Sequence, residues 1–139
     1  DDAHLLKHLS KFPDVQWDVY SKHNKKQFTL KNVTINPIQS DSFIKSMANA
    51  SGVLCGAGFE TPAEALYLNK KLLVVPMKNQ YEQHLNAAAL EQMGVPVINS
   101  LKRKYEYAIE AWLNSKNKVS VDYPDETRAI VTKIVEKHK

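Results

Sequence analysis

The sequence has a single cysteine, Cys55, and no apolar run close to the roughly 20 residues that span a bilayer. One cysteine excludes an internal disulfide and a metal cage built from cysteines. We expect Cys55 to be a buried thiol, because it ends an apolar run. Residues 1–4 lack the basic and apolar regions of a signal peptide. We therefore expect a cytoplasmic protein. Another domain of the same protein could bring it into peripheral contact with a membrane.

The composition also lacks a strong charge imbalance and low-complexity stretches. Of 139 residues, 43% are apolar and 24% are charged, and the net charge is +4. These values are typical of one globular domain over residues 1–139, not of a disordered or disulfide-rich chain. The basic residues form short clusters rather than one stripe, so we expect no nucleic-acid partner. The clusters are either solvated surface or attract an anionic ligand or membrane.

Apolar residues recur along the chain at helix and strand spacings in alternation. Residues 21–32 are polar and predict a loop, and the short apolar runs at 52–55 and 72–75 predict strands buried on both faces. The other expected elements are a helix over 5–12, strands over 15–19, 33–35 and 95–98, and helices around 43–48, 65–68, 80–93, 105–113 and 130–135. Gly94 is expected as the residue that ends the helix over 80–93.

Alternating strands and helices at this spacing imply right-handed crossovers. The fold class is therefore predicted as α/β, a doubly wound, Rossmann-like parallel sheet covered on both faces. The chain opens on a helix, where a doubly wound domain normally opens on a strand. We expect a fragment whose first strand and partner domain lie upstream.

Ligands of open parallel sheets bind beyond the carboxyl ends of the strands. Of the loops expected there, only residues 56–60 combine small residues with an immediate helix start. Free backbone N–H groups and the helix dipole can hold a phosphate at such a place. Gly56 and Gly58 would let the backbone approach the ligand closely.

The same segment also fits a helix cap that needs no ligand. Thr61 can be the N-cap, with Pro62 and Glu64 at the first and third helical positions. In that interpretation Glu64 turns back to the N-cap amide. With a ligand, its carboxylate accepts hydrogen bonds from two vicinal ribose hydroxyls. The residues alone leave both interpretations open.

A second polar segment opens the next helix on the same edge of the sheet. Glu82 and Gln83 offer the paired acceptors and donors that sugar hydroxyls need. The alternative is again a capping box, with Asn79 as N-cap and Glu82 three residues on. His84 either reaches the cleft or is simply exposed. His4 and His8 have the i, i+4 spacing of metal ligands, but no third ligand is evident, so we interpret them as surface histidines.

Three segments occur in an order and spacing that resemble the C-terminal domain of GT-B glycosyltransferases of family 28 and the UDP-glycosyltransferase type. They are GFETPAEAL at 58–66, LVVP at 73–76 and YEQHLNA at 81–87. The resemblance covers residues 33–98 well. Relatives of this kind include the bacterial transferase that adds N-acetylglucosamine to the lipid-linked peptidoglycan precursor.

The resemblance implies a nucleotide-sugar site on the start of the helix after Gly58. The amides of Gly58, Phe59 and Glu60, with the Thr61 hydroxyl, would hold the diphosphate of a UDP-sugar. Glu64 would hold the ribose.

The rest of the donor is assigned by the same resemblance. Glu82 and Gln83 would contact the donor sugar. The base would lie against Pro37, Ile38 and Gln39 through backbone groups, because that loop follows the neighbouring strand.

The chain departs from the resemblance at two carboxylates. Glu60 stands where many relatives have a small or apolar residue, and it would repel a diphosphate unless Lys78 or Lys22 offsets its charge. Glu82 stands where relatives often have Asp or Gln, so the identity of the sugar is not transferred. A longer tryptophan- and histidine-containing signature of plant and animal relatives is absent, which favours the bacterial branch.

The resemblance thus implies the donor-binding half of a glycosyltransferase that transfers a hexosyl group to an unknown acceptor. Backbone dipoles stabilise the leaving diphosphate, so no metal or other cofactor is expected. The catalytic base would lie on an N-terminal acceptor domain in cis or a partner subunit in trans, which leaves the isolated domain inactive. Two alternatives stay open, a one-domain nucleotide-binding subunit that needs a partner chain and a UDP-sugar epimerase-like domain. A dinucleotide-binding domain is disfavoured because Thr61 replaces the third glycine of its fingerprint.

Overall fold

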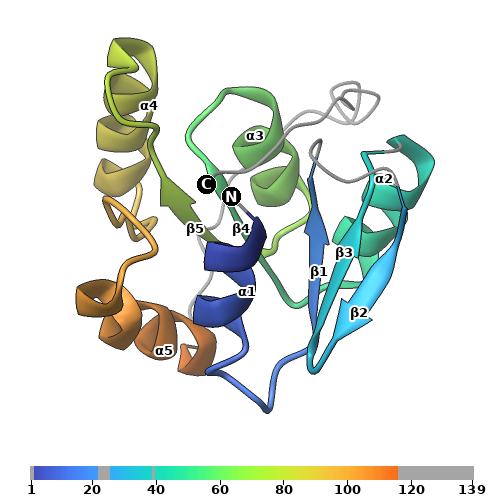
Figure 1. Ribbon diagram of the computed structural model, residues 1–139. Coiled ribbons are helices and arrows are strands. Elements are labelled where there is room, and N and C mark those ends of the chain that lie inside the picture. The colour runs from blue at the N-terminus through green and yellow to red at the C-terminus, as the bar shows by residue number, and fades with distance from the viewer. Residues whose placement is uncertain (1, 22–25, 39, 116–139) are drawn as a thin grey trace.

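The computed structural model describes residues 2–21, 26–38 and 40–115 (Figure 1). The first half of this region contains α1 (Asp2–Leu9), β1 (Trp17–Tyr20), β2 (Phe28–Leu30), β3 (Val33–Asn36) and α2 (Ser40–Asn49). The second half contains β4 (Gly52–Gly56), α3 (Glu60–Tyr67), β5 (Lys71–Val75), α4 (Tyr81–Gln92), the 3-10 turn η1 (Arg103–Tyr105) and α5 (Glu106–Asn114). The helix expected over 130–135 lies outside the described residues.

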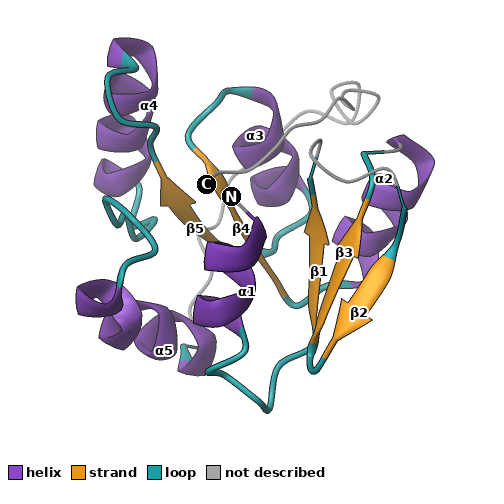
Figure 2. Ribbon diagram, viewed as in Figure 1, coloured by secondary structure: helices purple, strands orange, loops and turns teal. Residues whose placement is uncertain are grey.

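The described strands form two sheets (Figure 2). In the first sheet, β1 and β2 flank β3, which pairs parallel with β1 and antiparallel with β2. In the second, β4 and β5 pair parallel, from Gly52 opposite Lys71 to Gly56 opposite Val75. The predicted α/β class with parallel strands is confirmed. The parallel strands β4 and β5 are joined through α3, whereas the antiparallel strand β2 stands between β1 and β3 in the chain.

Two strand predictions need correction. The loop expected over 21–32 contains β2, whose three residues are all exposed and too few to show a strand pattern within a polar segment. Its place is set by the turn at Lys31, where φ is 57°, and by backbone pairing with β3. The strand expected over 95–98 is reduced to one bridge, between Val74 and Val97. Pro96 has no N–H to donate, so the pairing does not extend into a ladder.

Helices cover both faces of β5, as the sequence predicts. Leu73 packs with Leu9 of α1 and Ile109 of α5, whereas Val74 belongs to a second cluster with Leu66 of α3 and Ala87 of α4. Adjacent residues of a strand point to opposite faces, so the two clusters lie on opposite sides of the sheet. The carboxyl end of β5 is thereby fixed relative to both α3 and α4.

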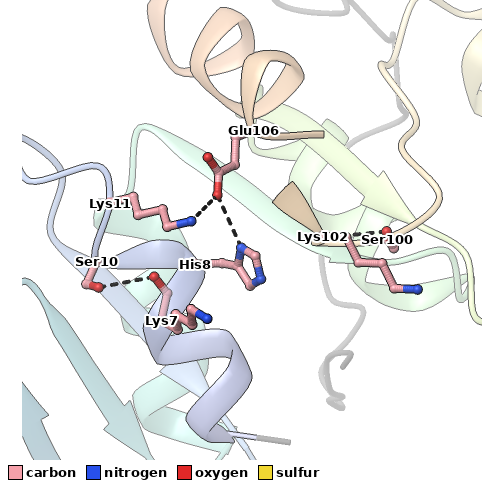
Figure 3. A network of polar contacts seen from close by, with 7 residues as sticks. All are labelled: Lys7, His8, Ser10, Lys11, Ser100, Lys102 and Glu106. Carbon is pink, nitrogen blue, oxygen red and sulfur yellow. Dashed lines mark hydrogen bonds and ion pairs between the residues drawn. The ribbon is translucent and has the colours of Figure 1, made fainter. Parts of the chain in front are cut away.

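A polar contact joins α1 to the start of α5 (Figure 3). Lys11 donates to the Glu106 carboxylate at 2.6 Å, and Nδ1 of His8 lies 3.4 Å from the same oxygen. The hydrogen bond from Lys11 holds the pKa of Glu106 below its usual value. His8 is buried, so its interpretation as a surface histidine is wrong. The side chain is covered because α1 packs this face against α5.

Candidate functional site

The start of α3 lies directly after the carboxyl end of β4. The helix begins at Glu60, and its N-cap residue is Phe59, which forms no side-chain hydrogen bond to the helix. Thr61 and Pro62 are therefore the second and third helical residues, and the capping box with Thr61 as N-cap is wrong. Proline is tolerated there because first-turn N–H groups have no partner within the helix. The amides at this helix start are left without a side-chain cap.

Gly58 leaves open space at the same helix start. A Cβ built on Gly58 would have no heavy atom within 4 Å. Its φ is not in the left-handed region, which among the described glycines is occupied only by Gly94, at 98°. Neither packing nor backbone conformation therefore requires a glycine at position 58. Next to it, the Phe59 side chain is 78% exposed. The space over the helix start is accessible to a ligand.

The start of α4 has a different structure. Its N-cap is Gln80, again without a side-chain hydrogen bond, while Asn79 has a φ of 67° in the preceding turn. The capping box built on Asn79 and Glu82 is therefore wrong as well. Instead, Oε1 of Gln83 accepts a hydrogen bond from the backbone N–H of Met77 at 2.8 Å. The Gln83 amide thus ties the helix start to the end of β5.

A second side chain of α4 reaches the loop before α3. Nδ2 of Asn86 donates to the backbone carbonyl of Ala57 at 3.0 Å. Sequence analysis did not single out Asn86. The signal was its position three residues after Gln83, which places both amides on one face of the helix. Asn86 holds the residue that precedes Gly58, and so it positions the open helix start.

A cleft of about 980 Å³ opens beside these residues. All four residues assigned to the diphosphate line it, together with Met77 and Gln83. We call this part of the cleft, lined by residues 58–61, Met77 and Gln83, the mouth. The structure thus brings together Gln83 and the diphosphate residues, which the sequence separates by more than twenty positions.

Other predicted site residues lie outside this lining. Glu64 is half-buried one turn further along α3, and Glu82 is exposed on α4. His84 is exposed and does not line the cleft either. Pro37 and Ile38 follow β3, which pairs with β1 and β2 and not with β4. The assumption that the base loop follows the strand next to β4 is therefore wrong, and Gln39 lies outside the described residues.

Charge near the mouth is sparse. Glu60 and Lys78 are both exposed, and within the described residues Glu60 forms no ion pair with Lys78. The other expected counter-charge, Lys22, is not among the described residues. Lys45 of α2 also lines the cleft, and sequence analysis missed it as a cation able to attract a phosphate. Its side chain is exposed, so a ligand could pair with it at little desolvation cost.

Covalent and metal chemistry find little support in the described residues. Cys55 is half-buried, and its apolar surroundings raise the pKa of the thiol to about 12. A thiol with this pKa stays protonated at neutral pH and is a poor nucleophile. In the part of the chain that the structure describes, no three His, Cys, Asp or Glu side chains are grouped as metal ligands.

Within the described residues, none of the helices has the length and apolar character needed to cross a bilayer.

Comparison with known proteins gave one match. A family model described as "Glycosyl transferase family 1" matches residues 1–115. This range holds both helix starts and all the described strands. Searches of curated proteins and of solved structures found no match.

Proposed function

The chain belongs to glycosyl transferase family 1, and on this premise we propose that it binds the nucleotide-sugar donor, a UDP-sugar, for transfer of a hexosyl group. The observation that carries the proposal is the start of α3. There, first-turn amides without a side-chain cap and an open glycine line the mouth of the cleft. This is the arrangement in which a helix N-terminus holds an anion.

The diphosphate would lie on this helix start. Backbone N–H groups of Gly58, Phe59 and Glu60 donate to its oxygens, and the Thr61 hydroxyl adds a further donor. During transfer, an acceptor oxygen bonds to the anomeric carbon while the bond to the diphosphate oxygen breaks. The bonding electrons go to that oxygen, where the amides and the positive end of the helix dipole stabilise the charge.

The rest of the donor would lie around the same mouth. The Glu64 carboxylate accepts from the ribose hydroxyls, and Glu82 and Gln83 contact the sugar. Oε1 of Gln83 already accepts a hydrogen bond from the backbone N–H of Met77. The N–H₂ group of the same side chain would therefore be the donor to a sugar hydroxyl. The family resemblance, and not the strand order, would place the base along residues 37–39.

The domain would be the C-terminal half of a GT-B enzyme of the family 28 and UDP-glycosyltransferase type. A catalytic base on an N-terminal acceptor domain, or on a partner subunit, takes the proton of the acceptor hydroxyl. We assign no catalytic residue within residues 1–139, and accordingly expect the isolated chain to bind the donor in the cytoplasm without transferring its sugar. We expect donor binding to need no metal or other cofactor, because backbone dipoles hold the diphosphate.

Calorimetric titration of the chain with UDP, 2′-deoxy-UDP, GDP and NAD tests the proposal. We expect UDP to bind more tightly than 2′-deoxy-UDP, GDP and NAD. Glu64→Ala should weaken UDP binding about 10-fold and remove the preference over 2′-deoxy-UDP, because the ribose hydroxyl loses its acceptor.

Glu91→Ala is the matched control, since Glu91 is an exposed carboxylate near the far end of α4. Equal binding of all four nucleotides would contradict the proposal. Equal effects of Glu64→Ala and Glu91→Ala would contradict the ribose assignment. Thermal melting of both variants shows whether each is folded.

A further inference from the structure

The two sheets face each other across the cleft with unpaired edges. Within the described residues, β1 pairs only with β3 and β4 pairs only with β5. Every residue of β1 and every residue of β4 lines the cleft. Exposed strand edges are normally covered or paired, because their free N–H and C=O groups would recruit another strand. Two such edges bordering one cleft form a slot.

The difference in burial between β4 and β5 supports this interpretation. The apolar residues of β5 are all buried from Leu72 to Val75, whereas every residue of β4 is only half-buried. Val53, Leu54 and Cys55 were predicted to be buried on both faces, like β5. These three residues are only half-buried because the space next to β4 is open.

Apolar side chains line this slot above and below the plane of the sheets. Leu5 and Leu9 of α1 line the cleft from one face, and Phe43 and Met47 of α2 line it too. The two pairs belong to the two separate core clusters, on opposite faces of β5. A β-strand with apolar residues on both faces would match these walls.

Strand order identifies the missing member. Read across both sheets, the order is β2, β3, β1, the slot, β4, β5 and the bridge at Val97, and β2 is the antiparallel strand. Doubly wound domains commonly have the order 3-2-1-4-5-6. In that order, β1 and β3 are the second and third strands, β4 and β5 are the fourth and fifth, and the slot is the place of the first.

The direction of α1 fits a strand in the slot. In Figure 1, α1 runs toward the amino ends of the strands, where a loop leads into β1. A parallel strand in the slot, followed by α1 and then β1, completes a right-handed crossover. We propose that the cleft between β1 and β4 is filled by one further β-strand of the same polypeptide, N-terminal to α1 and parallel to both neighbours.

Backbone geometry identifies a probe of the slot. The amides of Trp17 and Ser21 donate to the carbonyls of Asn32 and Asn36, on the β3 side. Successive amides of a strand point to opposite sides, so the amide of Asp18 points into the slot. A strand bound there would accept a hydrogen bond from it.

Amide hydrogen exchange without nucleotide tests the proposal, comparing the 139-residue chain with the longer polypeptide that carries it. In the longer polypeptide we expect the amide of Asp18, and those amides of residues 53–55 that point away from β5, to exchange at least about 100-fold more slowly. Leu73 of β5, already paired and buried, should change little and is the internal control. Equal exchange in both forms would overturn the proposal. So would slow exchange in the short chain caused by a dimer, which gel filtration detects.

A matched pair of variants in the longer polypeptide locates the contact. Asp18→Pro removes the N–H that points into the slot, whereas Asp18→Ala removes only the side chain. We expect Asp18→Pro, but not Asp18→Ala, to restore fast exchange at the amides of β4 that point away from β5. Protection that survives deletion of the residues before α1, or that resists Asp18→Pro, would contradict a strand at this place. Because no nucleotide is present, these results are independent of donor binding.

Discussion

The starts of α3 and α4 follow neighbouring parallel strands, yet their polar residues are used differently. Both sequences fit a capping box, and neither helix has a side-chain cap. At α4, the amides of Gln83 and Asn86 bond to the backbone of Met77 and Ala57. At α3, Gly58 and Thr61 line the cleft, and Gly58 has open space above it.

This difference indicates a division of work between the two helix starts. The side-chain amides of Gln83 and Asn86 hold the backbone on either side of the mouth, including the residue before Gly58. The start of α3 is thereby held in place, while its own residues line the cleft without a side-chain cap. Preorganised donors of this kind stabilise an anion without reorganising when it binds. In our account, α3 binds the diphosphate and α4 positions it.

Gly58→Val should lower UDP affinity the most while leaving the stability of the fold nearly unchanged. The new side chain has no neighbour to displace, so the melting temperature should stay nearly unchanged, while its methyl groups occupy the place of the diphosphate. We expect UDP affinity to fall by about 100-fold, the cost of losing several amide contacts to a charged group. Calorimetry and thermal melting measure the two effects.

Gly56→Ala is the control for this substitution. Its Cβ would lie 3.8 Å from Oε1 of Gln83 and from the carbonyl of Val75, which is ordinary contact. UDP affinity should change less than about threefold, because no hydrogen bond is removed. A loss as large as that of Gly58→Val would show that any added methyl group in this region disturbs binding.

Asn86→Ala should couple binding to stability, because it breaks the contact with Ala57. We expect a loss of about 1 kcal/mol in the free energy of unfolding, the usual value for one hydrogen bond. UDP affinity should fall about 5-fold as the loop before Gly58 becomes less ordered. Urea denaturation and calorimetry check the pair of effects. Asn86→Asp, which has no N–H to donate, should behave in the same way, and wild-type affinity in both variants would contradict a positioning role.

Gln83→Ala should affect the sugar more than the nucleotide. Without the amide, affinity for a UDP-sugar should fall about 5-fold, since one hydrogen bond to the sugar is lost. Affinity for UDP itself should stay nearly constant. Competition titrations with UDP and several UDP-hexoses measure the ratio, and Glu82→Ala shows whether the neighbouring carboxylate shares the role. Equal losses for UDP and UDP-sugars would instead assign Gln83 to holding the mouth alone.

The contribution of the contact between α1 and α5 to folding stability should depend on pH. We expect this to be the smallest of the predicted effects, and it should not affect the start of α3 or of α4. The pKa of Glu106 is lowered in the folded protein by the hydrogen bond from Lys11, so its stabilising contribution is complete above the ordinary pKa of an unfolded-state glutamate. It is lost as the pH falls through the lowered folded-state pKa. Acid titration of the melting temperature should be shallower in Glu106→Gln, while UDP affinity at neutral pH stays the same. An unchanged acid profile would contradict the role of the Lys11 contact.

The sequence predicted the strands around 52–55 and 72–75 and placed a helix start after each, because unalternated apolar runs and polar helix openings are strong local signals. It missed the caps, because α3 begins at Glu60, one residue before the predicted N-cap Thr61. A shift of this size leaves the residue pattern unchanged but alters every capping partner.

Features that depend on distant partners were beyond the local pattern. His8 is buried where α1 meets Glu106 of α5, far along the chain, and Asn86 acquires its role only through the carbonyl of Ala57. The half-exposed state of β4 likewise reflects the open space beside it rather than its own apolar sequence. Such contacts are set by how elements meet, which periodicity within one element does not report.

The most direct test of the central claim is the change in backbone amide chemical shifts when UDP is added to the ¹⁵N-labelled chain. Our account expects the largest changes at residues 58–61, smaller changes at residues 81–83, and little change at the contact between α1 and α5. Largest changes at the start of α4, or no change at residues 58–61 under saturating UDP, would contradict a diphosphate site on α3.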